Sequence, residues 1–342
     1  MIRPGPTNSI VDVPGVLVGQ QTLEGGSGVS VVLVPEGATA GVDVSGAAPG
    51  TRETDLLGPE NLVQQVQGVV LAGGSAFGLG AAGGVMRFLE EKGLGQPVGQ
   101  GRVVPIVPAA VIFDFDAGDP GVRPDAGDGY RAAQSASASS PQLGNVGAGA
   151  GATAGGFKGG VGTASTQLSG GITVAALAVV NPAGRVFDAV TGRLYAQDLL
   201  LQEDVDHPLP GEGISEAATR SAATDYSDLF PDDASLAGRN TTIGVVATNV
   251  QFDKAQCKRL ARAAQDGLAR AVWPSHTLFD GDTIFALSTG DVQVTGPAQV
   301  ARLGAAAADV FARAVTRGVT TARSAYGFGS WRDFLVQPRR KL

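Results

Sequence analysis

Six runs of apolar, largely β-branched residues recur along this chain, and glycine-rich breaks separate them. Runs of this length and composition are typical of β-strands, and those that are apolar throughout predict strands buried in the fold. The runs cover residues 29–34, 68–72, 103–107, 172–180, 243–250 and 283–287. Glycine supplies 51 of the 342 residues and aromatic residues only 6%. Small aliphatic side chains must therefore fill the core, which predicts closely packed layers.

Three segments show the three-to-four residue spacing of apolar side chains that indicates an amphipathic helix. The first covers residues 77–92 and ends at Gly93, a residue type that often follows a helix. The second follows Asp253, which can cap a helix N-terminus, and the third opens with Pro297. The last two helices each follow a predicted strand.

Charge and cysteine content exclude several classes of function. The net charge is −7, so the chain has no general attraction for nucleic acid or for anionic lipid. A single cysteine, Cys257, excludes an internal disulfide and a cysteine-based zinc site, and we expect no cofactor and no metal. No apolar run of 18 residues occurs, and Met1–Asn8 lacks the apolar core of a signal peptide, so the expected location is the cytoplasm.

An acidic connector runs directly into one of the predicted strands. Residues 202–239 contain nine Asp or Glu residues and little apolar periodicity, which predicts an exposed, mobile segment. The character of the chain changes at Asn240, because Thr241 begins the apolar run Thr-Thr-Ile-Gly-Val-Val-Ala. A hydroxyl residue thus lies where a mobile segment meets a buried strand.

Familiar catalytic and nucleotide-binding patterns fit poorly. His207 and His276 are the only histidines, which gives a Ser-His-Asp triad little to draw on. The sequence Gly78-Leu-Gly-Ala-Ala-Gly83 matches a dinucleotide fingerprint, but its glycines fall inside a predicted helix, where helix packing explains them better. Residues 147–162 lack the spacing of a phosphate loop and predict a flexible loop that carries Lys158, and residues 114–119 predict a solvated turn.

Thr241 supports a different chemistry. Its hydroxyl can attack the carbonyl of Asn240 to give an ester, and hydrolysis of that ester leaves Thr241 as a new N-terminus. A free α-amine has a pKa of about 7.7 to 8.0, so it can accept the hydroxyl proton near neutral pH. Nucleophile and base then belong to one residue, and no histidine is needed.

Four polar residues are candidates to assist Thr241. Asp280 and Asp282 lie two apart, so on a neighbouring strand both can reach the amine or hydroxyl of Thr241. Asn181, at the end of a predicted strand, can donate its amide to an oxyanion, and Lys158 can support that charge. Each residue also has an ordinary structural explanation, because Thr often opens strands, and Asp-Gly-Asp and Asn-Pro often form turns and loop starts.

The chain resembles the P1 family of peptidases, the DmpA-type L-aminopeptidase/D-esterase group that also includes nylon-oligomer hydrolases. The matching segments occur in order over most of the chain. They are Ile10-Val-Asp-Val-Pro-Gly15, residues 41–44, Gly50-Thr-Arg-Glu-Thr-Asp-Leu-Leu57, Leu71-Ala-Gly-Gly-Ser-Ala-Phe-Gly-Leu79, Phe157-Lys-Gly-Gly-Val-Gly-Thr163, Val180-Asn-Pro182, Asn240-Thr-Thr-Ile243 and Asp280-Gly-Asp-Thr283.

The resemblance implies an α+β fold, an αββα four-layer sandwich similar to that of N-terminal-nucleophile hydrolases. It implies one self-processing hydrolase domain over residues 1–342, cut before Thr241 into an α subunit of 240 residues and a β subunit of 102. Thr241 is then the nucleophile, and Asn181 matches the oxyanion-stabilising Asn. Lys158, Asp280 and Asp282 match the polar residues around the nucleophile. The processed protomers are expected to form tetramers.

Two positions depart from the family pattern, and one feature places the chain within the family. Phe113 stands where several members carry Tyr, so a hydroxyl near the oxyanion is missing, and Gln20 replaces a His. The Asn240–Thr241 junction is closer to the nylon-oligomer branch than to members with a Gly-Ser junction. We therefore expect a small-molecule amide hydrolase that acts on short peptides, amino-acid amides or 6-aminohexanoate oligomers. The alternatives are an acyltransferase of the ornithine acetyltransferase type and a non-catalytic, glycine-rich nucleotide-binding protein.

Overall fold

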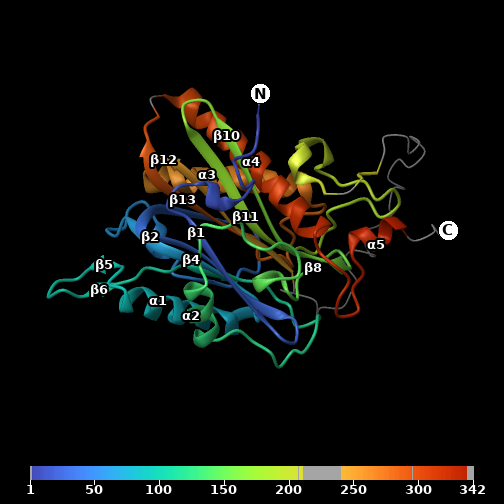
Figure 1. The fold of residues 1–342 in the computed structure, drawn as a ribbon, viewed down its shortest axis with the longest axis horizontal. Helices are drawn as coiled ribbons and strands as arrows, with labels where there is room; N and C mark the ends of the chain where they lie inside the picture. Colours follow the sequence, from blue (N-terminus) through green and yellow to red (C-terminus); the bar gives the residue numbers. More distant parts are fainter. Residues whose placement is uncertain (1, 207, 211–239, 295, 337–342) are drawn as a thin grey trace.

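The computed structural model describes residues 2–206, 208–210, 240–294 and 296–336. Within these residues two layers of strands lie between two pairs of helices, α1 with α2 on one side and α3 with α4 on the other (Figure 1). This arrangement is the αββα sandwich that the sequence resemblance implies. None of the helices in the described ranges combines the length and the apolarity needed to cross a bilayer.

The strands and helices have the following bounds. The main strands are β1 (Leu17–Leu23), β2 (Ser27–Val44), β3 (Thr51–Arg52), β4 (Gln65–Ala72), β7 (Ala109–Val111), β10 (Gly160–Leu168), β11 (Ile172–Asn181), β12 (Thr241–Val250) and β13 (Thr283–Val292). Short strands form two hairpins, β5 (Gln96–Pro97) with β6 (Val103–Val104) and β8 (Thr153–Ala154) with β9 (Phe157–Lys158). The helices are α1 (Ala81–Glu91), α2 (Ala126–Gln134), α3 (Lys254–Ala271), α4 (Pro297–Thr320) and α5 (Trp331–Val336). Six 3₁₀ turns among the described residues are η1 (Ile10–Asp12), η2 (Asp55–Leu57), η3 (Ser75–Gly80), η4 (Gly147–Gly149), η5 (Gln197–Leu199) and η6 (Gln202–Asp204).

The long strand β2 connects the two strand layers. In the described residues the order of hydrogen-bonded strands is β10-β11-β12-β13-β2-β4-β7-β3, and β1 also pairs with β2. Residues 39–44 of β2 pair with β13, whereas residues 29–33 and 38–39 pair with β4, with a register shift between Leu33 and Ala38. One strand therefore serves both layers and fixes how they face each other.

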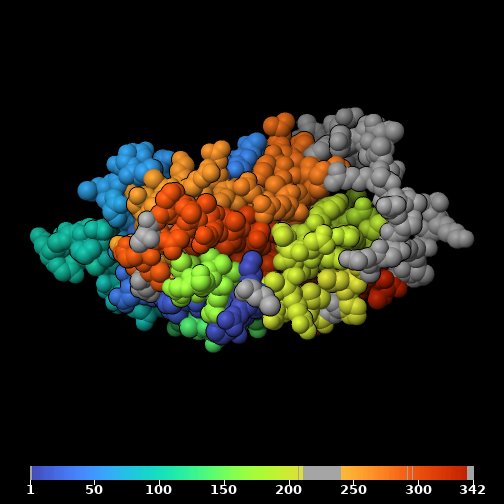
Figure 2. Space-filling model, turned by 90° about the horizontal axis from the view of Figure 1, so that it is seen from above, coloured from blue at the N-terminus to red at the C-terminus, as the bar shows by residue number. Residues whose placement is uncertain are grey.

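Alternate side chains along β11 and β12 pack into two different hydrophobic cores. Ile243, Val245 and Ala247 lie in the core between the two strand layers, whereas Val246 and Val250 lie in the core beneath α3 and α4. Successive side chains of a strand point to opposite faces. Thr241 and Asn181 share the parity of the residues in the middle core. Figure 2 looks onto α3 and α4 (orange to red), which lie at the surface beside the yellow segment that contains η5 and η6.

Most of the expected elements are present. Five of the six apolar runs lie within β2, β4, β11, β12 and β13, and α3 and α4 begin where Asp253 and Pro297 predict. Asp253 accepts a hydrogen bond from the Gln256 N–H, as a capping residue does. The strand expected at residues 103–107 is wrong, because only Val103–Val104 pair there; Pro105, which follows, cannot donate to a ladder.

One loop expectation is also wrong, and a second is wrong at one residue. The expected flexible loop at 147–162 consists of η4, β8, β9 and the start of β10, and Lys158 is fully buried. Its backbone is fixed by hydrogen bonds such as Gly159 N–H to the Ala152 carbonyl (2.9 Å). The acidic connector is exposed at Gln202, Glu203 and Asp206, as expected, but η6 buries Asp204. Residues 207 and 211–239 of that connector lie outside the described residues.

Arg313 of α4 anchors the start of this connector. Its guanidinium donates to both carboxylate oxygens of Asp204, at 2.6 and 3.1 Å, and also to Asn8 and to Thr166. Arg313 is 1% exposed, so this ion pair is shielded from water. Its partners lie before position 240 and Arg313 lies after it, so a chain cut before Thr241 keeps these bonds between its two pieces.

Replacing Arg313 with alanine is expected to lower the free energy of unfolding by about 3 to 5 kcal/mol, because buried Asp204 loses its two short bonds to a cation and keeps only Arg317, whose Nε lies 3.9 Å away. Urea denaturation of the variant measures this change. Arg193→Ala is the matched control, since the pair of Arg193 with Asp198 is 45% and 78% exposed and is worth less than about 1 kcal/mol. Equal losses in the two variants would contradict the anchoring role of Arg313.

Candidate active site

Strand pairing brings Thr241 beside Asn181. Asn181 is the last residue of β11, Thr241 is the first of β12, and the two are direct partners in the antiparallel register. Directly opposed residues have Cβ atoms about 4.5 to 5.5 Å apart. Both side chains face the core between the strand layers, and Thr241 is only 3% exposed. The candidate nucleophile and the candidate oxyanion donor therefore lie side by side.

The hydroxyl of Thr241 lies against the bond before it. It donates to the carbonyl oxygen of Asn240, and the same oxygen accepts the backbone N–H of Gly281 at 3.0 Å. Asn240 and Asp280 form a parallel bridge, which places the Asp280–Asp282 turn along this peptide bond. The carbonyl oxygen of Asn240 thus accepts from two donors, the Thr241 hydroxyl and the Gly281 N–H.

Asp280 and Asp282 are buried next to Thr241, but they do not occupy a strand as expected, because β13 begins at Thr283. Asp282 accepts the N–H of Thr242 at 2.7 Å. Asp280 accepts the N–H of Ala183 at 3.0 Å and the hydroxyl of Thr277 at 2.6 Å. Of their described hydrogen bonds, only the one from Thr242 to Asp282 comes from a neighbour of Thr241, and none involves the Thr241 side chain. Burial, together with the nearby Asp282 charge, raises the pKa of Asp280.

The turn that carries these carboxylates is held from behind by the loop after β2. The N–H groups of Ser45 and Gly46 donate to the Asp282 carbonyl, at 3.0 and 3.2 Å, and Ala48 donates to the Asp280 carbonyl at 2.9 Å. A Cβ on Gly281 would lie 2.5 Å from the Ala48 oxygen and 2.9 Å from the Thr241 hydroxyl. Only glycine therefore fits between this loop and the nucleophile.

The amide of Asn181 has a fixed orientation. Its oxygen accepts the N–H of Thr153 at 2.8 Å, and its nitrogen donates to the Phe113 carbonyl at 3.0 Å. Phe113, which lacks the hydroxyl that the resemblance leads one to look for, thus contributes a backbone carbonyl here. The amide group is held as a donor on the side of the sheet to which Thr241 also points.

Lys158 lies buried in a cage of carbonyl groups near Asn181. Its ammonium group donates to the carbonyls of Ala152, Gly149 and Gly159, and Ala152 directly precedes the Thr153 that holds Asn181. Burial lowers the pKa of Lys158 to about 7, and the charge of Asp114 partly offsets this effect. Lys158 can therefore exchange a proton near neutral pH, which an ordinary lysine cannot do.

Asp114 is a residue that sequence reasoning missed. It was expected in a solvated turn, but it is buried, and its carboxylate accepts the hydroxyl of Ser27 and the N–H of Gly74, each at 2.7 Å. Burial raises the pKa of Asp114, and these two bonds and Lys158 lower it in part. Its position next to Phe113, already noted as a departure from the family pattern, was the only available signal.

Gly281 and His276 were also missed as functional residues. Gly281 lies between Asp280 and Asp282, and these two candidate residues were the only indication that its backbone N–H belongs to the site. The sequence suggests for His276 only a place in a serine triad, yet its ring nitrogen Nδ1 lies 2.8 Å from Asp282. Its place six residues before Asp282 was the available signal. His207 lies outside the described residues.

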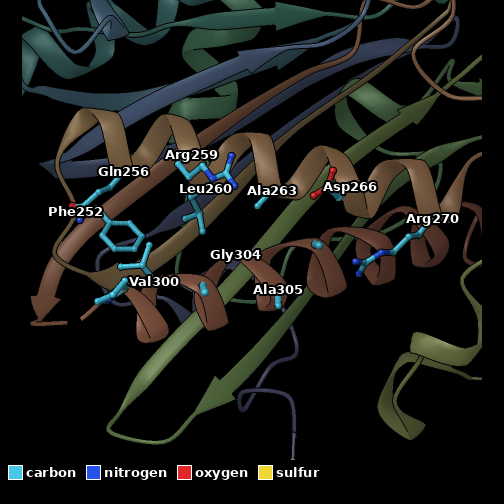
Figure 3. A pocket seen from close by; sticks show the side chains of 13 residues that line it. Phe252, Gln256, Arg259, Leu260, Ala263, Asp266, Arg270, Val300, Gly304 and Ala305 are labelled. Carbon is cyan, nitrogen blue, oxygen red and sulfur yellow. The ribbon is translucent and has the colours of Figure 1, made fainter. Parts of the chain in front are cut away.

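A separate groove lies between α3 and α4, on the other side of the strand layer from Thr241. It has a volume of about 400 Å³ and is lined by side chains that include Phe252, Leu260 and Val300 (Figure 3). These helices cover the face of β12 opposite to the one that carries Thr241. The groove is therefore not a part of the site around Thr241.

A family model and individual relatives place the chain in the same group of hydrolases. The model described as "Peptidase family S58" matches residues 8–331. A Mycobacterium leprae protein named as an uncharacterized aminopeptidase is 45% identical, and the alignment covers 97% of this chain and 95% of that protein. A 6-aminohexanoate-oligomer endohydrolase of Kocuria sp. is 31% identical, with 83% of this chain and 75% of that protein covered.

Solved structures agree on the fold. The L-aminopeptidase D-Ala-esterase/amidase of Ochrobactrum anthropi, described as a variant of the Ntn hydrolase fold, superposes with a TM-score of 0.71. The match covers 95% of this chain and 89% of that one at 24% identity. The expected fold class is confirmed by this similarity together with the four layers described above.

Proposed function

The chain belongs to peptidase family S58 and is a hydrolase of amide bonds, and on this premise we propose that it cuts its own Asn240–Thr241 bond and then uses Thr241 as an N-terminal nucleophile. One observation carries the proposal. The Thr241 hydroxyl lies against the Asn240 carbonyl, while the Gly281 N–H donates to the oxygen of that carbonyl.

Self-cleavage follows from this geometry in two steps. The Thr241 oxygen attacks the Asn240 carbonyl carbon, and the Gly281 N–H stabilises the charge that develops on the carbonyl oxygen. The C–N bond then breaks and the Thr241 nitrogen takes up a proton, which leaves an ester between Asn240 and the Thr241 oxygen. Water hydrolyses this ester, so Asn240 ends in a carboxylate and Thr241 carries a free amine.

Lys158 is the group suited to accept the hydroxyl proton during self-cleavage, when no free α-amine exists. Its pKa of about 7 makes a neutral amine available near neutral pH. Three contacts link it to Thr241: Lys158 bonds to Ala152, the adjacent Thr153 bonds to Asn181, and Asn181 pairs with Thr241. A base with a pKa close to the working pH transfers protons most efficiently.

After cleavage the roles are redistributed. The α-amine of Thr241 accepts the hydroxyl proton as the hydroxyl attacks a substrate amide, and the Asn181 amide stabilises the oxyanion. The leaving amine takes the proton, and water then releases the acid from the acyl-threonine ester. Asp282, bound to the N–H of Thr242, keeps the start of β12 in place. Asp280 holds the Thr277 and Ala183 segments around it.

We propose short peptides, amino-acid amides and 6-aminohexanoate oligomers as the substrates. The names of the relatives support this range, since they include aminopeptidases and an endohydrolase of 6-aminohexanoate oligomers. The tetrameric assembly of processed protomers and the cytoplasmic location stay predictions.

Product analysis tests hydrolysis against acyl transfer, the alternative that shares the acyl-threonine intermediate. The purified protein is incubated with an amino-acid amide or a 6-aminohexanoate oligomer, with and without excess free amino acid, and products are identified by mass spectrometry. Hydrolysis predicts free acid and amine in equal amounts in both mixtures. Acylated amino acid as the main product would contradict hydrolysis and favour an acyltransferase.

A further inference from the structure

The side chain of His276 contacts the carboxylate that holds the chain next to the nucleophile. Its Nδ1 lies 2.8 Å from Asp282 Oδ2, and its backbone N–H donates to the same oxygen at 3.2 Å. The other oxygen, Oδ1, accepts the N–H of Thr242 at 2.7 Å. One carboxylate thus bridges His276 and the residue that follows Thr241.

The bridge is buried at one end and open at the other. Asp282 is 1% exposed, whereas the His276 side chain is 24% exposed. His276 has a left-handed backbone, with φ of +54°, which non-glycine residues seldom adopt. This conformation lets its backbone N–H and its ring bond to one carboxylate oxygen. A partly buried ring is therefore linked to the start of β12 through two hydrogen bonds.

The groups that face His276 favour a positive charge on its ring. They are the Asp282 carboxylate, the nearby Asp280 carboxylate and the backbone carbonyl of Gln265 in α3. Burial lowers the pKa of His276, but the hydrogen bond and the charge of Asp282, with Asp280 and the Gln265 carbonyl, raise it above its ordinary value. A buried pair of carboxylates is costly without a counter-charge. The imidazolium supplies that charge.

We propose that His276 is a positioning residue, which as an imidazolium holds Asp282 in the orientation that fixes Thr241 and Thr242 for self-cleavage. This inference rests on the self-cleavage proposed above and adds a residue to it. His276 does not touch the Asn240–Thr241 bond in its described contacts, and it acts through Asp282. Substitutions of His276 can separate two effects of its side chain, the hydrogen bond to Asp282 and the positive charge that balances the carboxylates.

The rate of self-cleavage is followed by pulse labelling of the full chain in cell-free synthesis, with the two fragments separated by denaturing electrophoresis. His276→Ala removes both the hydrogen bond and the charge, and we expect cleavage to slow about tenfold to 100-fold near pH 7. His276→Asn keeps a donor near the position of Nδ1 without a charge, so its rate is expected between wild type and His276→Ala. Leu278→Ala, in the same loop and 80% exposed, is the matched control and stays within about twofold of wild type.

The pH dependence separates a positioning role from general damage to the fold. A raised pKa means that the imidazolium persists to a higher pH than in an ordinary histidine and is lost as the pH rises further. Wild type is therefore expected to lose its advantage over His276→Asn as the pH of the assay is raised, and the two rates are compared at about pH 7 and about pH 9.5. A folding defect in either variant would not produce this convergence.

Two results would overturn the inference. One is a His276→Ala variant that cleaves at the wild-type rate, and the other is a ratio of wild-type to His276→Asn rates that is the same at both pH values. If His276→Ala does not fold, the second comparison decides alone. A wild-type chain that stays intact at every pH would instead overturn the proposed function, and this inference with it.

Discussion

Thr241→Ala is expected to give an intact chain without amidase activity, because one hydroxyl serves both self-cleavage and substrate attack. Removal of a catalytic nucleophile lowers the turnover rate by a factor of about 10³ or more. The Thr241 hydroxyl is the group that lies against the Asn240 carbonyl, and a methyl group cannot attack it. Denaturing electrophoresis measures the first effect, and release of amine from an amino-acid amide measures the second.

Two further variants control this result. Thr241→Ser keeps a hydroxyl at the same position, so the chain is expected to be cut and to keep activity. Thr242→Val changes a neighbouring hydroxyl that is buried without a hydrogen-bond partner in the described structure, and it keeps the backbone N–H that binds Asp282. We expect Thr242→Val to be cut like wild type. Cleavage of Thr241→Ala between the same two residues would contradict the proposed nucleophile.

Lys158→Met is expected to slow self-cleavage about 100-fold or more near pH 7, because methionine fills the buried space but cannot accept a proton. The pulse-labelling assay measures this rate. Lys254→Met is the matched control. Lys254 is also buried, and it donates to the Leu56 and Asn61 carbonyls, at 2.9 and 3.0 Å, in another part of the fold. Loss of cleavage in both variants to the same extent would point to folding and not to proton transfer.

Lys158→Met is also expected to change how the free energy of unfolding depends on pH. The folded pKa of Lys158 is about 7, below its ordinary value of 10.5, so between these pH values the unfolded chain binds a proton that the folded chain lacks. The free energy of unfolding of the wild type should therefore rise, relative to Lys158→Met, as the pH increases through this window. Urea denaturation at about pH 6 and about pH 9 measures the difference. A difference that does not change with pH would contradict a lowered pKa.

The regular elements could largely be predicted from local patterns. The run 243–250 is apolar throughout and forms β12, and the Asp253 cap and Pro297 mark the first turns of α3 and α4. These signals depend on residues close in sequence. The strand expected at 103–107 failed for an equally local reason, since proline interrupts it.

The site could be predicted in composition but not in geometry. That Asn181 lies opposite Thr241 follows from the register of β11 with β12. The paired residues of these strands are 60 to 74 positions apart, and packing of the whole sheet selects their register. Lys158 looked mobile among glycines, but those glycines allow the backbone to close around its ammonium group. Asp114 looked solvated because its partners, Ser27 and Gly74, come from distant segments.

The central claim is that the bond before Thr241 is broken in the active protein. N-terminal sequencing of the purified, amidase-active wild type tests this claim most directly. The account predicts two sequences in equal amounts, one from the start of the chain and one that reads Thr-Thr-Ile-Gly-Val from Thr241. A fully active preparation that yields only the sequence at the start of the chain would contradict it.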